Sequence, residues 1–131
     1  MEDSKLAIRE SAAAQDLKTQ VIDAALEVHK NIGLGFGKQE YSRALAHELG
    51  LRDIPFERKK KVKLSYKGSV AGEYNLDFVV DNFLVIFVST EEQLSLSAES
   101  KLKSILRSVK LKSGLILNFS KEILEIKTVK R

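Results

Sequence analysis

The sequence predicts an α/β (α+β) fold in which helices flank one mixed β-sheet. Two segments with helical periodicity come first, and residues 56–88 then follow the alternating and continuous apolar patterns of strands. A third helical segment precedes two further short strands. The order of helix, helix, three strands, helix, strand, strand is that of a mixed sheet with helices packed on it.

The two N-terminal helices follow from the spacing of their apolar residues. Within residues 13–32 and again within residues 38–49, apolar side chains recur every three or four positions. The glycine-rich segment 33–37 is expected to end the first helix, since glycine takes the left-handed conformation at helix C-termini, and Gly50 is expected to end the second. The glycine-rich segment 33–37 follows a helix, whereas a phosphate-binding loop follows a strand, so we interpret this segment as a helix cap.

Three strands are expected in the middle of the chain. Residues 56–66 alternate between apolar and mostly cationic side chains, which is the pattern of a half-buried strand. The residue pairs Lys67–Gly68 and Asp81–Asn82 are typical of tight turns, and they delimit a second strand. The third strand, Phe83–Val88, is an unbroken apolar run, which indicates a strand covered on both faces.

The C-terminal part supplies one helix and two more strands. The helix is expected at Ala98–Lys110, and a short buried strand follows at Leu115–Phe119. The last strand is expected within Glu122–Val129, at an edge of the sheet.

The length of 131 residues is enough for one domain with its own core. We expect residues 13–131 to form this domain and the polar residues 1–12 to be a frayed N-terminal segment. The absence of cysteine excludes a disulfide scaffold, a thiol nucleophile and a cysteine-ligated metal.

Charge and hydropathy bear on partners and location. The net charge of +4 and the isoelectric point near 9.3 favour polyanionic partners. No segment has the length and hydropathy of a membrane span, and the N-terminus lacks a signal-peptide core. We therefore expect no membrane partner and a cytoplasmic location.

Asp77 is an acidic residue inside an apolar strand. Burying a carboxylate costs several kcal/mol unless a counter-charge or hydrogen bonds compensate. One interpretation is an acid on an edge strand that faces solvent. The other is an acid at a strand end that binds a metal, which requires a second carboxylate nearby, but the neighbouring strand offers Phe87, Val88 and Ser89.

Several segments, taken together and in order, resemble a known family. They are residues 25–33, Gly35, Tyr41, residues 54–58, residues 66–68, residues 76–77 and residues 114–119. Over about residues 17–130, the sequence is similar to the GxxExxY family, whose members are small proteins on the PD-(D/E)XK nuclease-like fold.

The resemblance implies a restriction-endonuclease-like core with an aspartate on one strand and Glu-x-Lys on the next. In such sites the two acids hold Mg²⁺, which activates water, and the lysine orients that water. Asp77 matches the aspartate, but the glutamate position holds Phe87 and the lysine position holds Ser89. The glutamate of the family's naming motif is replaced by Lys38, so the motif here reads Gly35-x-x-Lys38-x-x-Tyr41.

The remaining matches are on the helices. Glu27 and His29 on the first helix agree with the family, as does Tyr41 on the second, so the remnant site comprises Asp77, Glu27, Lys38 and Tyr41. His29 and His47 are interpreted as ordinary helix residues rather than catalytic bases. The substitutions shift the site by two charge units towards positive, so we expect it to attract anions rather than a divalent cation.

Three hypotheses remain open. The first is a catalytically inactive nuclease-like protein that binds nucleic acid or another anion through basic residues on the first strand and the last helix. Beside Lys38 and Lys101, these residues are Arg58, Lys59, Lys60, Lys61, Lys63, Lys103, Arg107 and Lys110.

The second hypothesis is a scaffold subunit with a protein partner or a second copy of itself, because a fold can outlast its chemistry. The third is a Mg²⁺-dependent nuclease with a rearranged site, in which Lys38 replaces the missing lysine and Glu91 or Glu92 the missing acid. Only this third hypothesis requires a cofactor, Mg²⁺, for which Asp77 is the candidate ligand.

Overall fold

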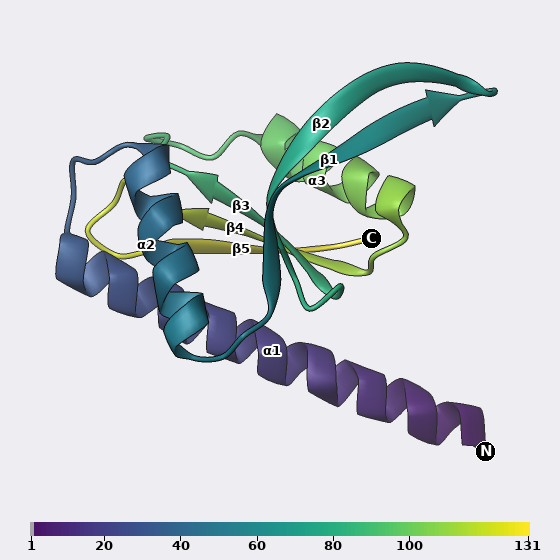
Figure 1. The fold of residues 1–131 in the computed structure, drawn as a ribbon, viewed down its shortest axis with the longest axis horizontal. Helices are drawn as coiled ribbons and strands as arrows, with labels where there is room; N and C mark the ends of the chain where they lie inside the picture. Colours follow the sequence, from purple (N-terminus) through teal and green to yellow (C-terminus); the bar gives the residue numbers. More distant parts are fainter. Residues whose placement is uncertain (1) are drawn as a thin grey trace.

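The computed structural model describes the backbone of residues 2–131 and the side chains of residue 13 and residues 15–131. Helices and strands follow one another in the predicted order (Figure 1). Their bounds are α1 Glu2–Ile32, α2 Lys38–Leu51, β1 Phe56–Tyr66, β2 Ser69–Val80, β3 Leu84–Ser89, α3 Leu96–Val109, β4 Ser113–Asn118 and β5 Glu125–Lys130.

The five strands form one mixed sheet in the order β1-β2-β3-β4-β5. Neighbouring strands are antiparallel except for β3 and β4, which are parallel. A parallel pair needs a crossover connection, and α3 provides it. The predicted fold class, a mixed sheet flanked by helices, is therefore confirmed.

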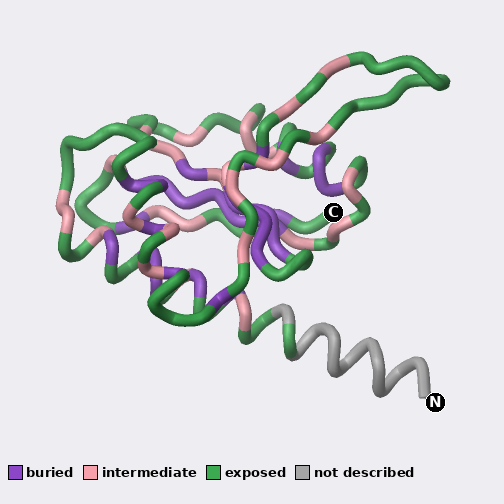
Figure 2. Tube along the Cα trace, in the orientation of Figure 1, coloured by how far each residue is buried: buried purple, intermediate pink, exposed green. Residues whose placement is uncertain are grey.

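Helices cover both faces of the sheet (Figure 1). On one face, α1 and α2 pack against alternate residues of the strands, including Leu84 and Ile86 of β3. On the other face, α3 packs against the intervening residues, including Val85. The buried segments lie between these layers (Figure 2). The prediction that the third strand is covered on both faces is confirmed.

The predicted turns are present, with one shift in a strand boundary. Lys67 and Gly68 have φ values of 47° and 84°, and Asp81 and Asn82 have values of 50° and 55°. Phe83, which the sequence assigned to the third strand, instead completes the second turn through a hydrogen bond from its N–H to the Val80 carbonyl. The ring of Phe83 lies on the surface, since this residue is 43% exposed.

The second helix ends at Leu51, two residues later than the predicted end at Leu49. Gly50 lies inside α2, which ends at Leu51, and the N–H of Arg52 donates to the carbonyl of Glu48. Asp53 then turns the chain with a φ of 56°. A glycine can therefore be part of a helix when the residues that follow it supply the terminal hydrogen bonds.

Helix α1 ends as expected at Gly33, which has a φ of 80° and donates its N–H to the His29 carbonyl. The helix starts at Glu2, earlier than the periodicity from residue 13 indicated. The proposed fraying of residues 1–12 concerns side chains outside the described set and stays a prediction. Within the described residues, no helix is both long and apolar enough to cross a membrane.

The hairpin of β1 and β2 changes face part of the way along. Phe78 and Val80 face α1 and α2, whereas Leu76 faces α3. The change occurs opposite Lys59, whose φ of 52° is left-handed, a conformation that side chains other than glycine rarely adopt. Beyond this point the hairpin extends away from the rest of the sheet (Figure 1). We call residues 59–76 the arm.

Helix α3 approaches β4 most closely at Gly114. A Cβ atom placed there would lie 2.9 Å from Leu102 Cδ2, inside van der Waals contact. We expect Gly114→Ala to lower the free energy of unfolding by about 1–3 kcal/mol, because a packed core resists an added methyl group. Urea unfolding monitored by circular dichroism measures this. Gly50→Ala is the control, since nothing lies within 4 Å of that position, and it should be neutral or stabilising.

Lys18 of α1 is buried, at 7% exposure. Burial, and then the charge of Lys130, lower the pKa of its ammonium group. A lowered lysine pKa means that the charged form destabilises the fold, so we expect Lys18→Met to raise the thermal midpoint at pH 7. The advantage of this variant over the wild type should shrink as the pH rises towards 10.5, the ordinary lysine value. Thermal melts between pH 7 and pH 10.5 measure both effects, and an unchanged advantage would contradict the explanation.

Candidate functional site

Asp77 lies where β2 separates from β3. The ladder between these strands comprises the pairs Val80–Leu84, Val79–Val85 and Phe78–Ile86, and Asp77 is the next residue of β2. Its Oδ2 accepts a hydrogen bond of 2.9 Å from the N–H of Val88. The carboxylate thus takes the place of a backbone acceptor just beyond the last regular pair of the ladder.

The other oxygen of Asp77 is paired with Lys38. The Nζ atom of Lys38 lies 2.9 Å from Asp77 Oδ1, and the side chains are 51% and 18% exposed, respectively. Lys38 is the first residue of α2, so the start of this helix brings the ammonium group to the sheet. Because β2 is an interior strand, the interpretation of Asp77 as a solvent-facing acid on an edge strand is wrong.

Neither Phe87 nor Ser89 adds an acid to this pair. Phe87 is half-buried and packs with the core under α3. The hydroxyl of Ser89 accepts a hydrogen bond of 3.2 Å from the N–H of Glu91. The site therefore consists of one carboxylate, one ammonium group and the end of an apolar strand.

A buried asparagine holds the loop after β3 in place, and the sequence interpretation missed it. Asn118 is fully buried and donates hydrogen bonds of 2.7 Å to the Glu91 carbonyl and 3.0 Å to Glu125 Oε1. The hydroxyl of Ser120 donates to the same Glu91 carbonyl over 2.6 Å. These bonds fix the backbone of Glu91, whose side chain is exposed. A polar residue at the end of a buried apolar strand was the available signal.

The hydrogen bond from Asn118 is also the largest reason why the pKa of Glu125 lies below its ordinary value. Lys121 contributes as well, with its Nζ atom 3.4 Å from Glu125 Oε2. Glu125 is therefore held in its charged form as part of the structure around the loop.

Tyr41 of α2 contacts both the end of α1 and the core. It is 1% exposed, and its hydroxyl donates a hydrogen bond of 2.6 Å to the carbonyl of Gly33 at the end of α1. Its ring stacks on Phe119 with centroids 4.7 Å apart. This contact ties α2 to the C-terminal end of α1, so Tyr41 fixes the linker that positions Lys38.

The α1 residues of the predicted remnant site lie apart from the pair of Lys38 and Asp77. Glu27 is exposed, and its carboxylate accepts a hydrogen bond of 2.9 Å from Asn31 on the same helix. The ring nitrogen Nε2 of His29 lies 2.7 Å from the Lys121 carbonyl. His47 is exposed on α2. Of the predicted site residues, the described contacts join only Lys38 and Asp77.

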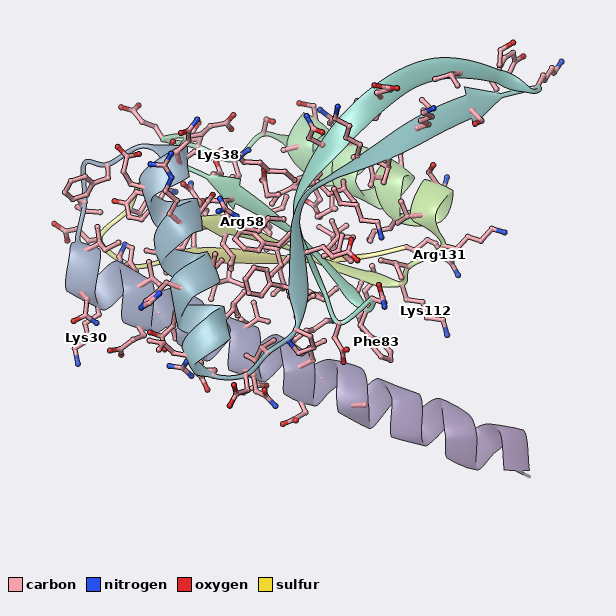
Figure 3. All side chains as sticks on the ribbon, viewed as in Figure 1. Lys30, Lys38, Arg58, Phe83, Lys112 and Arg131 are labelled. Carbon is pink, nitrogen blue, oxygen red and sulfur yellow. The ribbon has the colours of Figure 1, made fainter. Side chains whose placement is uncertain are left out.

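The basic residues of β1 differ in their surroundings. The guanidinium carbon of Arg58 lies 5.4 Å from the centroid of the Phe78 ring, and among the described residues its buried Nε has no hydrogen-bond partner. Phe78 packs in the core layer under α1 and α2, so Arg58, labelled in Figure 3, lies on that face of the sheet. Lys60 pairs with Glu57 over 3.3 Å, whereas Lys61 and Lys63 are exposed.

The basic residues of α3 divide between two flanks. A groove between α3 and the arm is lined on the helix by Lys101, Ser104, Ile105 and Ser108. At about 100° per residue, Lys103 and Arg107 lie on the opposite flank, and Lys110 is the left-handed cap that follows the helix. On that flank Glu99 pairs with Lys127 of β5 over 3.8 Å. The structure thus brings only Lys101 of this group next to the arm.

The donor set does not fit a divalent metal ion. Mg²⁺ binds several oxygen ligands, and here both oxygens of Asp77 already have partners, while Phe87 and Ser89 on the neighbouring strand β3 supply no carboxylate. Among the side chains that the structure describes, no three acidic or histidine residues gather closely enough to hold a metal.

A mixed sheet with helices on both faces and an acid where two central strands separate is the architecture of a nuclease-like α+β domain. The chain belongs to the PD-(D/E)XK nuclease superfamily, whose family model matches residues 15–131. No curated protein and no solved structure matches it. The resemblance found in the sequence is thereby confirmed at the level of the superfamily.

We expect Tyr41→Phe to lower the free energy of unfolding by about 1–2 kcal/mol, because the Gly33 carbonyl loses its hydrogen bond in a partly buried place. Chemical unfolding measures the difference. Tyr66→Phe is the matched control, since the Tyr66 side chain is 64% exposed at the arm and should tolerate the change. Equal stability of Tyr41→Phe and wild type would contradict the structural role of this hydroxyl.

Proposed function

We propose that this chain is a PD-(D/E)XK protein that binds nucleic acid or a similar polyanion without cleaving it. The observation that carries the proposal is the ion pair between Lys38 and Asp77, at 2.9 Å. A carboxylate that would help to hold a metal in an active nuclease has here a lysine as its counter-charge. Lys38 occupies the position at which the GxxExxY pattern has a glutamate.

The chemistry of hydrolysis supports the proposal. Attack on a phosphodiester needs a metal ion that activates water and a positioned cation that stabilises the transition state. The aligned metal-ligand position holds Phe87, whose ring supplies no oxygen, and the aligned lysine position holds Ser89. Loss of one transition-state-stabilising group commonly lowers the rate about 10²–10³-fold, and two groups are replaced here.

The charge of the chain supports the binding part of the proposal. Its net charge is +4, so it attracts a phosphate backbone over a range that shortens as dissolved salt screens the charges. Binding that depends on this attraction needs no metal and weakens as counter-ions compete.

The test is equilibrium binding of fluorescent duplex and single-stranded oligonucleotides across a salt series, in EDTA and in Mg²⁺ or Mn²⁺, with the same samples examined on denaturing gels. We expect affinity in EDTA that falls with salt and intact oligonucleotide throughout. Metal-dependent cleavage that is lost in Asp77→Ala would establish a rearranged nuclease instead. The absence of binding at modest salt would end the proposal.

A sharper prediction concerns the counter-charge itself. Lys38→Glu places a second carboxylate beside Asp77, so we expect the thermal midpoint to fall and Ca²⁺ or Mg²⁺ to restore part of it. Wild type should show no metal-dependent shift at the same ionic strength. Lys38→Gln is the control, which removes the charge without adding an acid and should cost about 0.5–1 kcal/mol with no response to metal. A metal-dependent shift in wild type would contradict the proposal.

A second candidate function is that of an interaction subunit, and the groove between α3 and the arm favours it. Val62, Leu64, Tyr74 and Ile105 give this groove an apolar lining in a cavity of about 70 Å³. Size-exclusion chromatography with light scattering, together with pull-down from the native lysate, distinguishes this candidate. A strictly monomeric protein without a stable partner would count against it.

A further inference from the structure

We infer that the arm, and not α3, is the surface on which a nucleic-acid backbone lies, and that its lysines lead this backbone to Lys38. The inference rests on the proposed function and adds the binding surface to it. The ligand chemistry is a row of phosphodiester groups, which both duplex and single-stranded nucleic acids present. Four observations on the arm carry the inference.

The first observation is where the charge of the chain lies. Within residues 59–76 there are five cationic residues and one acidic one, so the arm has a net charge of +4. This equals the net charge of the whole chain, and the other residues together are neutral. A polyanion that approaches the molecule is therefore attracted to the arm.

The second observation is the direction of the lysines. Val62 and Tyr74 are cross-strand partners and pack on the side of α3. Because side chains alternate along a strand, Lys61 and Lys63 point to the opposite side, where both are exposed. Lys63 stands between Val62 and Leu64 in the lining of the groove, so its backbone borders the groove while its side chain alternates to the other face. We call this side the outer face of the arm.

The spacing of these lysines suits a phosphate backbone. Alternate residues of a strand lie about 6.6 Å apart. The charges of one strand of a duplex repeat about every 3.4 Å along its axis, so a lysine on every second residue can meet every second phosphate. A two-stranded ribbon is also narrow enough to enter the major groove of a duplex.

The third observation is that the outer face continues towards the site. The hairpin changes face at Lys59, so the outer face of the arm becomes the face that α2 covers nearer the domain. Lys38 reaches Asp77 from α2 on that same side. A backbone that follows Lys63 and Lys61 inward therefore arrives at Lys59 and then at the ammonium group of Lys38.

The fourth observation is that Lys103 and Arg107, which we call the basic stripe of α3, lie away from this path. The groove side of α3 faces the arm, and Lys103 and Arg107 lie on the flank towards β5. A straight backbone on the outer face of the arm cannot contact them. This stripe consequently supplies a control with the same chemistry at a different place.

The acidic residue of the arm, Glu73, allows a test in which affinity should rise rather than fall. Glu73 is the cross-strand partner of Lys63 and shares the outer face with it. Its carboxylate repels a phosphate at this position, so its neutralisation should strengthen binding. A variant that raises affinity is informative because loss of folding cannot produce it.

The experiment compares three variants with wild type by fluorescence anisotropy, on a duplex and on a single-stranded oligonucleotide, from about 50 to 200 mM salt. They are Lys61→Ala/Lys63→Ala on the arm, Lys103→Ala/Arg107→Ala on α3 as the matched control, and Glu73→Gln. Circular dichroism and thermal melts establish that each variant folds.

We expect the arm variant to lose about tenfold in affinity and to reduce the slope of log K against log salt by about 1.8 on the duplex or about 1.4 on the single strand. The α3 variant should bind like wild type, and Glu73→Gln should bind several-fold more tightly. The form of oligonucleotide that wild type binds more tightly identifies the natural source of the backbone.

Two outcomes separate this inference from the proposed function. If wild type binds and the arm variant binds equally well, or if the α3 variant is the one that loses affinity, the arm is not the binding surface while the proposed function stands. If wild type binds neither oligonucleotide at the lowest salt, both fail.

Discussion

The carboxylate of Asp77 is the constraint on which the arrangement around the site depends. It accepts the N–H of Val88 with one oxygen and the ammonium group of Lys38 with the other. An acid at 18% exposure needs such partners, because burial without them costs several kcal/mol. The two contacts join three elements, since β2, β3 and α2 meet at this one side chain. The separation of β2 from β3 therefore leaves no unsatisfied backbone donor at Val88.

The ion pair between Lys38 and Asp77 limits what the site can hold. Lys38 is part of the chain and is present at Asp77 whatever the composition of the solution, whereas a free ion binds only at sufficient concentration. A divalent ion would have to displace this ammonium group and would gain no second carboxylate from Phe87 or Ser89. The same lysine, half exposed, still presents positive charge to an anion. For this reason we propose that the site holds a phosphate rather than activating water.

Local patterns in the sequence were enough to predict the elements, but not how distant elements meet. The order of helices and strands, the buried third strand and both tight turns follow from periodicity and turn residues. The end of α2 beyond Gly50 depends on hydrogen bonds from later residues, which no local pattern contains. Both Lys38 and Asp77 were named as site residues, yet their ion pair depends on the path of the linker at residues 33–37. The face change at Lys59 and the contacts of Asn118 likewise arise from tertiary packing.

Asp77 also has a structural role that involves no catalysis. Its bond to Val88 sets the residue at which β2 leaves β3, and the arm starts from this point. On the neighbouring strand β1, Lys59 lies opposite Asp77 and takes a left-handed conformation. The outer face of the arm therefore continues the face on which Lys38 lies. Removal of the carboxylate would free Lys38 and also release the base of the arm. One acid therefore serves both the local charge balance and the direction of the most basic segment of the chain, and neither role requires a metal ion.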